Sequence, residues 1–357
     1  MDAVMLVGGQ GTRLRPLTMS APKPMLPVAG VPVTAHMLAR ARDAGIDRVV
    51  LATSYRAEVF EEYFGDGSAH GLELEYVTET EPLGTGGAIR NVAGRLRSGP
   101  DEPVVIFNGD ILSGLDIAAL VRRHTDTDAA VTLHLTQVVD PRAFGVVPTD
   151  GAGRVTAFLE KTPDPPTNLI NAGCYVFRRS VIDTIPAGRP VSVERESFPG
   201  MLAAGTPVFG YPDSTYWLDL GTPGAFVQGS RDLVTGRIAS SALPGPVGDC
   251  LVLAGAVVAT DAKIGGGATV GAGARVGTGA AVDGAVLFDG AVIEAGASVR
   301  DSVIGRGAVI GPGVVLDGVV VGDGAVLEAG NELRAGARVF PGARLAAGAV
   351  RFSSDRT

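Results

Sequence analysis

An arginine and a lysine follow a cluster of glycines near the start of the chain. Gly8, Gly9 and Gly11 come first, and Arg13 and Lys23 follow them. Glycines let the backbone approach an anion and present N–H groups to it, and arginine grips a diphosphate through two parallel hydrogen bonds. Lysine supplies a compact charge that can follow negative charge as it builds up on phosphorus. The pattern therefore predicts a loop that binds phosphate.

Lysine is rare in this chain. Lys23, Lys161 and Lys263 are the only lysines among 30 basic residues, which indicates that lysine stands where its chemistry is needed. The glycine spacing also excludes two other phosphate-binding loops. A dinucleotide loop of the form G-x-G-x-x-G needs a glycine where Leu14 stands, and no G-K-[ST] of a P-loop follows.

An open sheet with helices must hold this loop. The apolar run 3–7 predicts a first strand, so the loop leaves the carboxyl end of a strand, where α/β sheets bind their ligands. Strand and helix patterns alternate up to about residue 235, which predicts an α/β fold with a doubly wound, Rossmann-like mixed sheet. The predicted strands are 49–53, 74–77 and 104–107, the predicted helices 35–44, 57–64 and 85–96, and a strand-rich part follows at 130–138, 155–159 and 171–177.

Beyond residue 249 large aliphatic residues recur, and nearly every step between them is six residues. The series begins at Ile264, Val270, Val276 and Val282, and glycine or alanine commonly follows each of them. This spacing is typical of a hexapeptide-repeat, left-handed parallel β-helix. Steps of five residues, at 282 to 287, 299 to 304 and 316 to 321, predict that one side of successive coils is shorter by one residue.

Three segments follow from these patterns. They are a catalytic domain at 1–237, a linker at 238–249 and a β-helix domain at 250–357. A chain of 357 residues with 46% hydrophobic residues can supply the cores of two domains.

Composition narrows the classes of function. A net charge of −8 argues against a nucleic-acid-binding surface. No apolar run approaches the roughly 20 residues that span a membrane, and no signal-peptide pattern precedes the first strand, so we expect a cytoplasmic protein. Cys174 and Cys250 match no metal-binding or redox spacing.

The chain resembles the sugar-phosphate nucleotidylyltransferases, the pyrophosphorylases that make nucleotide sugars. The run GGQGTRLRPLT…PKPMLPV resembles their signature. Later motifs resemble theirs in order and spacing, namely EPLGTGGAI (81–89), FNGD (107–110), FGVV (144–147), FLEK (158–161), NAGCYVF (171–177) and WLDLGTP (217–223). The resemblance is closest to the mannose-1-phosphate guanylyltransferase branch, which carries a C-terminal hexapeptide-repeat β-helix.

This resemblance implies a reaction between two anions. A sugar 1-phosphate oxygen attacks the α-phosphorus of a nucleoside triphosphate, and pyrophosphate leaves. Such catalysis is mainly positioning and charge neutralisation, so Arg13 and Lys23 are the implied catalytic residues. Asp110 and Asp219 match the metal carboxylates of the family and would bind Mg²⁺ together with phosphate oxygens.

The resemblance also implies the binding residues. In the family, the lysine at the position of Lys161 holds the phosphate of the incoming sugar, and the glutamate at the position of Glu160 accepts from sugar hydroxyls. The implied nucleotide-binding residues are Leu6, Gly8, Gly9, Gly11, Thr12, Glu81 and Gly86, and the implied substrate-binding residues are Gly145, Glu160, Lys161, Asn171 and Gly173.

The identity of the base is predicted from one carboxylate. Family members that use uracil or thymine tend to carry glutamine where this chain has Glu81. Guanine offers two adjacent N–H donors, which one carboxylate can accept together. We therefore predict GTP as the nucleotide, with Glu79 as a second candidate acid.

Several alternatives remain open from the sequence. The acceptor is mannose 1-phosphate or a similar sugar phosphate, or a cyclitol or other sugar-like phosphate of specialised metabolism. The nucleotide is dTTP, ATP or UTP if Glu81 does not touch the base. A non-catalytic nucleotide-sugar-binding subunit is a third hypothesis, which the presence of Arg13, Lys23, Asp110, Lys161 and Asp219 disfavours.

The β-helix is predicted to be structural or to join subunits. Some hexapeptide-repeat proteins are acyltransferases with a histidine base, but all 4 histidines of this chain precede the repeats. We therefore expect a homo-oligomer, formed through the flat faces or the end of the β-helix.

Overall fold

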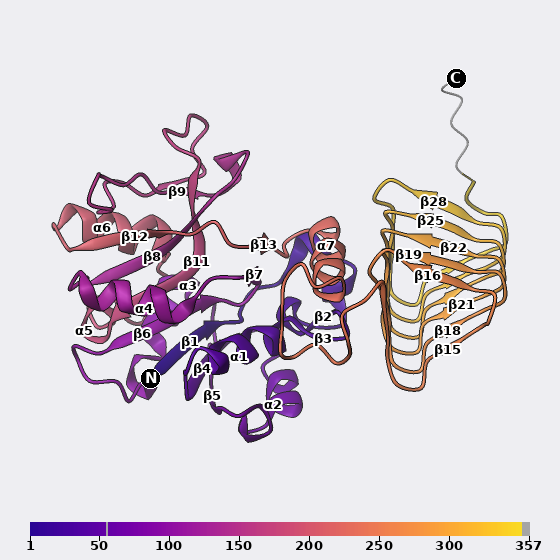
Figure 1. Ribbon diagram of the computed structural model, residues 1–357, viewed down its shortest axis with the longest axis horizontal. Coiled ribbons are helices and arrows are strands. Elements are labelled where there is room, and N and C mark those ends of the chain that lie inside the picture. The colour runs from indigo at the N-terminus through magenta and orange to yellow at the C-terminus, as the bar shows by residue number, and fades with distance from the viewer. Residues whose placement is uncertain (55, 352–357) are drawn as a thin grey trace. The chain divides into compact units, whose positions relative to one another are not determined.

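The computed structural model describes residues 1–54 and 56–351 (Figure 1). Contacts divide the chain into two compact units. The first unit comprises residues 1–9 and 37–217, and the second comprises residues 10–36 together with the chain from residue 218. The phosphate loop is thus divided between the units after Gly9. The predicted boundaries at 237 and 249 stay a prediction, and positions 352–357 of the predicted β-helix domain lie outside the described residues.

A nine-stranded mixed sheet forms the centre of the first unit. Its order is β10, β9, β11, β6, β1, β4 and β5, and β8 pairs with both β11 and β12. The strands β6, β1, β4 and β5 are parallel, and β11 runs antiparallel to β6. The predicted α/β class and Rossmann-like mixed sheet are confirmed. The strands are β1 (Asp2–Leu6), β4 (Arg48–Thr53), β5 (Glu73–Thr78), β6 (Pro103–Asn108), β8 (Val131–Gln137), β9 (Gly145–Val146), β10 (Leu159–Glu160), β11 (Leu169–Arg178) and β12 (Val208–Pro212).

Helices lie mostly where the sequence predicts them. The predicted helix 85–96 is an exception, because α3 ends at Asn91 and a 3₁₀ turn follows at Ala93–Arg95. The turn leaves the carbonyl of Arg95 facing the Arg48 guanidinium, which donates to it at 2.8 Å. The helices that lie wholly or mostly in this unit are α1 (Val33–Asp43), α2 (Glu58–Phe64), α3 (Gly84–Asn91), α4 (Ile117–Asp126), α5 (Arg179–Ile182) and α6 (Phe198–Ala203).

The core of the first unit is apolar and aromatic. Phe198 begins α6 and packs on the sheet against Tyr175 and Phe177, with ring centroids 5.3 and 6.1 Å away. The predicted strand 155–159 does not form as one element, because Val155 makes an isolated bridge to Thr149 and only the last position joins β10. Within the described residues, no helix is long and apolar enough to cross a membrane.

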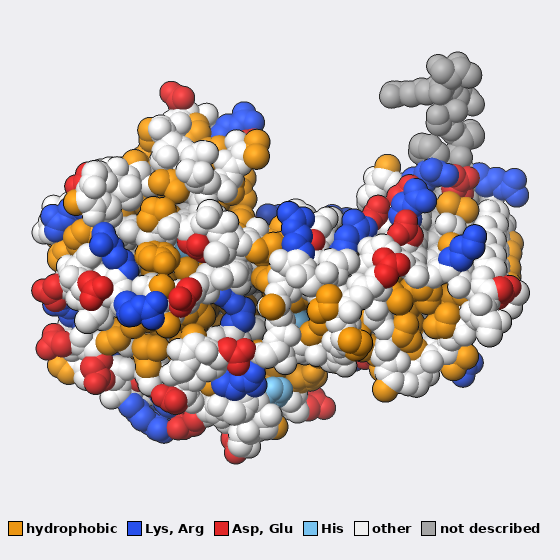
Figure 2. Space-filling model, in the orientation of Figure 1, with side chains coloured by type: hydrophobic (Ala, Val, Ile, Leu, Met, Phe, Trp, Pro, Cys, Tyr) orange, Lys and Arg blue, Asp and Glu red, His pale blue; other side chains and the backbone are white. Residues whose placement is uncertain are grey.

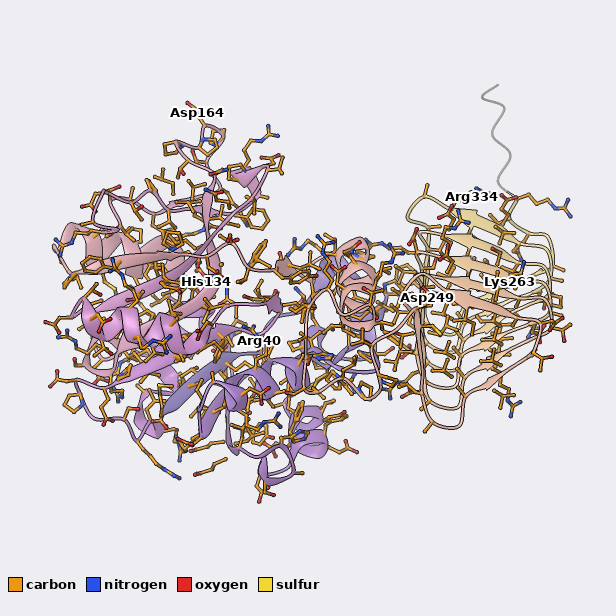
Figure 3. All side chains as sticks on the ribbon, viewed as in Figure 1. Arg40, His134, Asp164, Asp249, Lys263 and Arg334 are labelled. Atoms are coloured by element: carbon orange, nitrogen blue, oxygen red, sulfur yellow. The ribbon has the colours of Figure 1, made fainter. Side chains whose placement is uncertain are left out.

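Some polar side chains are buried in this unit. His134, labelled in Figure 3, is 1% exposed, and its Nε2 lies 3.5 Å from Asp213 Oδ2. Burial lowers the pKa of His134 to about 4, so the imidazole is neutral at pH 7. Burial also raises the pKa of the Cys174 thiol to about 12, which leaves that thiol unreactive.

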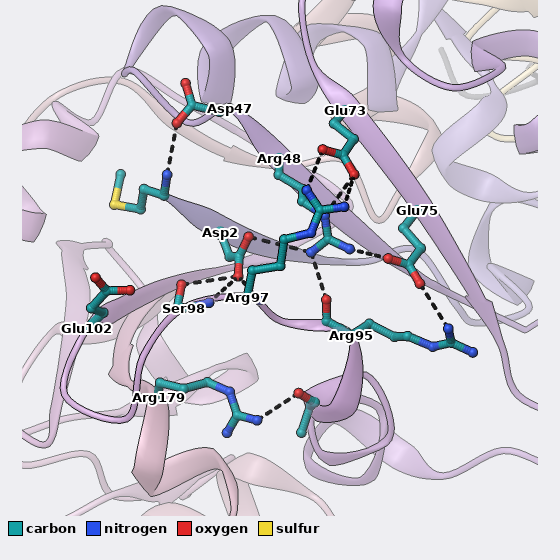
Figure 4. Close-up of polar contacts among 12 residues, drawn as sticks. Asp2, Asp47, Arg48, Glu73, Glu75, Arg95, Arg97, Ser98, Glu102 and Arg179 are labelled. Atoms are coloured by element: carbon teal, nitrogen blue, oxygen red, sulfur yellow. Dashed lines mark hydrogen bonds and ion pairs between the residues drawn. The ribbon is translucent and has the colours of Figure 1, made fainter.

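Charged residues close the amino edge of the parallel strands (Figure 4). Asp2 and Arg48 begin β1 and β4, are both 5% exposed, and form an ion pair. Burial alone would raise the pKa of Asp2, but the Ser98 and Arg97 amides, the Ser98 hydroxyl and the Arg48 charge together lower the pKa below its usual value. This polar cluster lies at the edge opposite the carboxyl ends of these strands, so those ends are left for ligands.

The second unit begins with the rest of the phosphate loop. Short 3₁₀ turns at Thr12–Leu14, Leu17–Met19 and Lys23–Met25 lead into a hairpin of β2 (Pro27–Val28) and β3 (Val31–Pro32). The long helix α7 (Pro223–Val234) packs against β2.

One buried serine links three parts of this unit. Ser230 on α7 is fully buried, and its hydroxyl accepts from the Ala29 amide at 3.0 Å. The same hydroxyl lies 3.1 Å from Thr269 Oγ1 on the β-helix strand β17 (Ala268–Val270). The hairpin, the helix and the β-helix are therefore one packed body.

The repeats form a left-handed parallel β-helix of three sheets, as predicted. Val286 pairs with Val303 and Val303 with Val320, so coils in the middle take 17 residues. The five-residue steps lie where the third sheet passes to the first. The first sheet contains β14, β17, β20, β23, β26 and β29, the second β15, β18, β21, β24, β27 and β30, and the third β16, β19, β22, β25 and β28.

The β-helix strands are two or three residues long. They are β14 (Cys250–Val252), β15 (Val257–Val258), β16 (Lys263–Gly265), β17 (Ala268–Val270), β18 (Arg275–Val276), β19 (Ala281–Asp283), β20 (Val286–Leu287), β21 (Val292–Ile293), β22 (Ser298–Arg300), β23 (Val303–Ile304), β24 (Val309–Ile310), β25 (Val315–Asp317), β26 (Val320–Val321), β27 (Val326–Leu327), β28 (Glu332–Arg334), β29 (Arg338–Val339) and β30 (Arg344–Leu345).

Candidate active site

The first two loop glycines lie just after β1. Gly9 has a φ of 109°, a conformation that other residues rarely adopt, and its amide donates to Ser54 Oγ at 3.3 Å. A Cβ on Gly8 would lie 2.9 Å from the same Oγ. Leu6 is half-buried at the end of β1, and both glycines are exposed. Close packing against Ser54 therefore explains the small residues, and their exposure suits a ligand.

Asp110 lies beside this loop in the first unit. It follows β6 and precedes β7 (Ile111–Ser113), and β6 is the parallel neighbour of β1, with Leu6 opposite Asn108. The amide of Gly109 donates to Leu6 O at 2.9 Å, and a Cβ on Gly109 would lie only 2.5 Å from that oxygen. The glycine therefore keeps the strand ends close, and Asp110 emerges at the same sheet edge as the loop.

Helix α3 carries the glycine-rich motif predicted to contact the base. The amides of Gly86 and Gly87 both donate to Val191 O, at 2.8 and 3.2 Å. A Cβ on Gly86 would lie 2.9 Å from Val191 Cγ1. These glycines therefore permit close packing inside the protein, and the Gly86 amide donates its hydrogen bond to Val191 O.

The two candidate acids for the base differ in their surroundings. Glu79 accepts from the Leu83 amide at 3.2 Å, just before α3 begins. Burial raises the pKa of Glu79, and the Leu83 amide opposes that rise. Glu81 is exposed. Glu79 therefore binds a backbone amide at the start of α3, whereas Glu81 is exposed to solvent.

The acceptor motifs meet in a short pair of strands. Gly145 of β9 pairs with Glu160 of β10. A Cβ on Gly145 would lie 2.8 Å from the Phe158 ring and 2.9 Å from Glu160 Oε2, so only glycine leaves room for that carboxylate. Lys161 has a φ of 55° and donates its amide to Phe144 O, and its exposed ammonium lies 3.7 Å from Glu160 Oε1. The structure thus brings Gly145, Glu160 and Lys161 together.

Asn171 and Gly173 shape an irregularity in β11. The register against β8 shifts between Asn171 and Tyr175. Asn171 Oδ1 accepts from the Gly173 amide at 3.1 Å, and Asn171 Nδ2 donates to the Tyr175 hydroxyl at 2.8 Å. Gly173 has a φ of 78°, and a Cβ there would lie 3.0 Å from Asn108 Nδ2. These contacts join the acceptor strand to the end of β6.

Trp217 is the site residue that the motifs did not single out. Its Nε1 donates to Ala172 O at 2.9 Å, and its ring meets that of Phe144 edge to face at 5.6 Å between centroids. It therefore packs between the two acceptor segments. A single tryptophan inside the WLDLGTP motif was a signal that could have identified it.

Three of the predicted residues gather in the second unit. Lys23 Nζ lies 3.6 Å from Asp219 Oδ1, and the Arg13 guanidinium lies 3.9 Å from Asp219 Oδ2. The Lys23 side chain is 10% exposed and the Arg13 side chain 65% exposed. Asp219 ends β13 (Trp217–Asp219). A carboxylate is therefore held between two cations, one of which is open to solvent.

Glycines fit tightly in this cluster too. Gly11 has a φ of 57°, and a Cβ there would lie 2.9 Å from both Lys23 Cβ and Thr18 Cγ2. Thr12 is exposed at the start of the first 3₁₀ turn. A Cβ on Gly221 would lie 2.5 Å from the Arg13 guanidinium. Close approach of the loop to Lys23 and Asp219 thus depends on glycine.

The predicted site residues therefore form two sets. The first unit brings together Leu6, Gly8, Gly9, Asp110 and the acceptor residues, with Glu81 and Gly86 at α3, which packs on β1. The loop residues and Asp110 lie at the carboxyl ends of β1 and β6, and Asn171 and Gly173 lie in the amino-terminal half of β11, which runs antiparallel to β6. The second unit brings together Gly11, Thr12, Arg13, Lys23 and Asp219.

The carboxylates suit one kind of metal. Among the described residues, no group of three or more His, Cys, Asp and Glu side chains gathers in a way that could hold a metal ion. Asp110 and Asp219 offer hard oxygen donors, and Mg²⁺ is usually bound by one or two carboxylates together with substrate phosphates and water. Each of the two carboxylates, one in each unit, is therefore a donor of the kind that Mg²⁺ accepts.

Family models match both parts of the chain. Residues 2–236 match the model of the nucleotidyl transferase family, and residues 246–347 match the model of the GMPPB C-terminal domain.

Known proteins are similar to the chain. It is 60% identical over 265 residues to the mannose-1-phosphate guanylyltransferase of Mycobacterium tuberculosis (strain ATCC 25618 / H37Rv), covering 74% of this chain and 73% of that protein. The crystal structure of HddC from Yersinia pseudotuberculosis complexed with GMP-PN has a TM-score of 0.56 and 26% identity, covering 65% of this chain and 98% of that one. A putative glucose-1-phosphate thymidylyltransferase from Bacillus anthracis, with a TM-score of 0.60 and 21% identity over 69% of this chain and all of that one, shares the fold.

Proposed function

We propose that this chain, which belongs to the nucleotidyl transferase family and is a nucleotidyltransferase, transfers GMP from GTP to mannose 1-phosphate and releases pyrophosphate. The identity of 60% with a mannose-1-phosphate guanylyltransferase over most of both chains is the observation that carries these substrates. The product is a GDP-sugar, in which the two phosphates join the sugar to guanosine.

The two cations of the second unit supply charge neutralisation. The sugar 1-phosphate oxygen forms a bond to the α-phosphorus of GTP while the bond from that phosphorus to the bridging oxygen breaks, and pyrophosphate carries that oxygen away. Lys23 is nearly buried and has a fixed ion pair with Asp219, so its ammonium is already positioned. Arg13 is open to solvent, which suits a guanidinium that grips the diphosphate part of GTP.

The acceptor set of the first unit orients the sugar phosphate. Lys161 has an exposed ammonium that binds the phosphate of the acceptor, and Glu160 holds that ammonium at 3.7 Å. The Glu160 carboxylate accepts from sugar hydroxyls in the space that Gly145 leaves open. Asn171 and Gly173 contribute the shape of β11 beside this space.

Guanine is recognised by Glu81. Its exposed carboxylate precedes α3, and it can accept the N1–H and N2–H₂ donors of guanine together. Glu79 already accepts from a backbone amide, which favours Glu81 over Glu79 for this task.

Magnesium is the proposed metal, held by Asp110 and Asp219. When bound, it would neutralise charge on the phosphates and offset the repulsion between the two substrates. Removing it with a chelator should stop turnover, and adding Mg²⁺ back should restore it.

The test is pyrophosphate release by the purified protein with Mg²⁺. Four nucleoside triphosphates are paired with mannose 1-phosphate, glucose 1-phosphate and a cyclitol phosphate. Release with GTP and mannose 1-phosphate supports the proposal. Release only with another pair reassigns the substrate, and no release with any pair, in protein that still binds a nucleotide sugar, would indicate a binding subunit.

We also propose a homo-oligomer that forms through the β-helix. The second sheet leaves valines partly exposed on its outer face, and Val257 is 62% exposed. Sedimentation equilibrium over a range of protein concentrations tests this, and a monomer at every concentration would contradict it.

A further inference from the structure

The outer faces of two β-helix sheets differ sharply in exposure. Residues that point out of the first sheet are buried, although they lie outside the β-helix core: Thr269, Val286, Val303 and Val320 are at most 2% exposed. On the second sheet the equivalent Val257 is 62% exposed, and Arg275 and Arg344 are exposed. Figure 2 shows hydrophobic side chains on the face that carries β15, β18 and β21. The first sheet is therefore covered by the rest of its own unit.

Contacts to this covered sheet run along its length. Near the first coil, Ser230 of α7 meets Thr269, and a Cβ on Gly30 would lie 2.7 Å from Leu253. One coil further, the rings of Phe226 and Phe288 meet at 6.3 Å. These contacts come from the hairpin and from α7, which are the segments that continue the phosphate loop and follow Asp219.

The last coil makes a polar contact to the phosphate loop itself. Arg338 begins β29 and stands opposite Val320, in the position that buried aliphatic residues occupy in the preceding coils. Its guanidinium donates to Arg15 O at 2.6 Å. A charged donor makes such a bond stronger than a neutral one would.

Arg15 ends the turn that carries Arg13. The amide of Leu14 donates to Gly11 O at 3.0 Å, and the amide of Arg15 donates to Thr12 O at 3.2 Å. Arg13 lies inside this turn, and its side chain is mostly exposed with a long ion pair to Asp219. The place of the Arg13 guanidinium therefore depends on the backbone of the turn, which Arg338 holds at its carboxyl end.

We infer that Arg338 is a positioning residue for the reaction, through which the last β-helix coil fixes the turn that carries Arg13. Arg338 touches backbone rather than substrate, so it acts through Arg13. The catalytic consequence rests on the proposed function, whereas the effect on the turn does not.

The first test measures the turn directly by amide hydrogen exchange of the full-length protein. Arg338→Gln keeps a long polar side chain but loses the charge, and we expect peptides covering residues 12–20 to exchange about three to ten times faster. Arg344→Gln is the matched control, because Arg344 is exposed in the same coil and pairs with Glu328. It should leave those peptides unchanged.

The second test measures kinetics. Arg338→Gln should lower kcat/KM for the nucleoside triphosphate about three- to tenfold, as expected for loss of one charge-assisted hydrogen bond, with the KM of the sugar phosphate unchanged. Arg338→Lys retains a charged donor and should recover part of the loss. Thermal unfolding of each variant is followed alongside, because a general loss of stability would lower all parameters together.

The outcomes are separable. Faster exchange at residues 12–20 with the expected kinetic change supports the inference. Exchange and kinetics equal to those of Arg344→Gln would overturn it, as would an equal loss in Arg338→Gln and Arg338→Lys that follows a lower melting temperature. Faster exchange in a protein that releases no pyrophosphate would uphold the contact to the turn and reject the proposed function.

Discussion

Lys23 Nζ lies 3.6 Å from Asp219 Oδ1, and both side chains are largely buried. The two residues come from opposite ends of the family model match, yet they belong to the same compact unit. An ammonium and a carboxylate at this distance hold each other in place before any ligand binds, so the cation is positioned in advance for a phosphate.

Lys23→Ala should lower kcat for pyrophosphate release about 100- to 1000-fold, because a preorganised cation at developing charge is removed. Lys23→Arg should not restore it, since a planar guanidinium cannot replace a compact ammonium in a buried position. Steady-state kinetics with GTP measure the effect. Lys263→Ala, at the exposed first position of β16 (Figure 3), is the control and should keep its full rate. An unchanged kcat in Lys23→Ala would remove Lys23 from the mechanism.

Gly221→Ala should lower activity while leaving the fold intact. Its methyl group would lie 2.5 Å from the Arg13 guanidinium and 2.9 Å from Asp219 Oδ1, so Arg13 must move. Misplacement of a catalytic group by about 1 Å can cost up to roughly 100-fold in rate. Gly224→Ala, at a position with no atom within 4 Å of the added methyl, should keep its activity. Equal rates in the two variants would contradict the prediction.

Glu81→Gln should reduce the preference for GTP over other nucleoside triphosphates by about 10- to 100-fold, the effect of losing hydrogen bonds to a charged acceptor. Competition between GTP and UTP in one assay measures the preference. Glu79→Gln should leave the preference intact and lower the free energy of unfolding by about 1 kcal/mol, because Glu79 accepts from the Leu83 amide. A shift of preference in Glu79→Gln instead would assign the base contact to Glu79.

Asp2→Asn should destabilise the protein by about 1–3 kcal/mol at pH 7, because Asp2 is buried with Arg48 and the Ser98 amide. The folded-state pKa of Asp2 is lowered, so its stabilisation is complete above the unfolded-state pKa near 3.9 and is lost as pH falls through the folded value. Urea unfolding at pH 7, 5, 4 and 3 should show the difference between wild type and variant shrinking only at the acid end. Asp47→Asn, at an exposed ion pair, should change stability by less than about 1 kcal/mol.

The β-helix is the part most fully predictable from sequence. Each coil needs an aliphatic residue at fixed positions. The spacing of Val270, Leu287, Ile304 and Val321 therefore identifies the first sheet from neighbouring residues alone, without information on contacts between distant segments. The five-residue steps likewise located the short corner before the strands were known, because a missing residue on one side changes only the local spacing.

The remaining parts of the fold and the site could not be predicted from the sequence, because they depend on contacts between segments that lie far apart in the chain. The strand β12 joins the sheet beside β8 in parallel, and its pairing depends on segments that lie far apart in the chain. The glycines of α3 read as a nucleotide motif, but the packing of Gly86 on Val191 could not be inferred from spacing. The motif residues themselves were predicted as a set, and their division between two units was not, because motif order carries no information about which segments pack together.

The bond from Arg338 to Arg15 also limits how this chain can change in length. Successive coils of a β-helix lie about 4.8 Å apart, and a solenoid can usually gain or lose a whole repeat without harm to its own core. Here the loss of one coil would withdraw the Arg338 guanidinium by about 4.8 Å from a carbonyl that it now reaches at 2.6 Å. The contact to the amino-terminal turn therefore constrains the number of coils between α7 and Arg338.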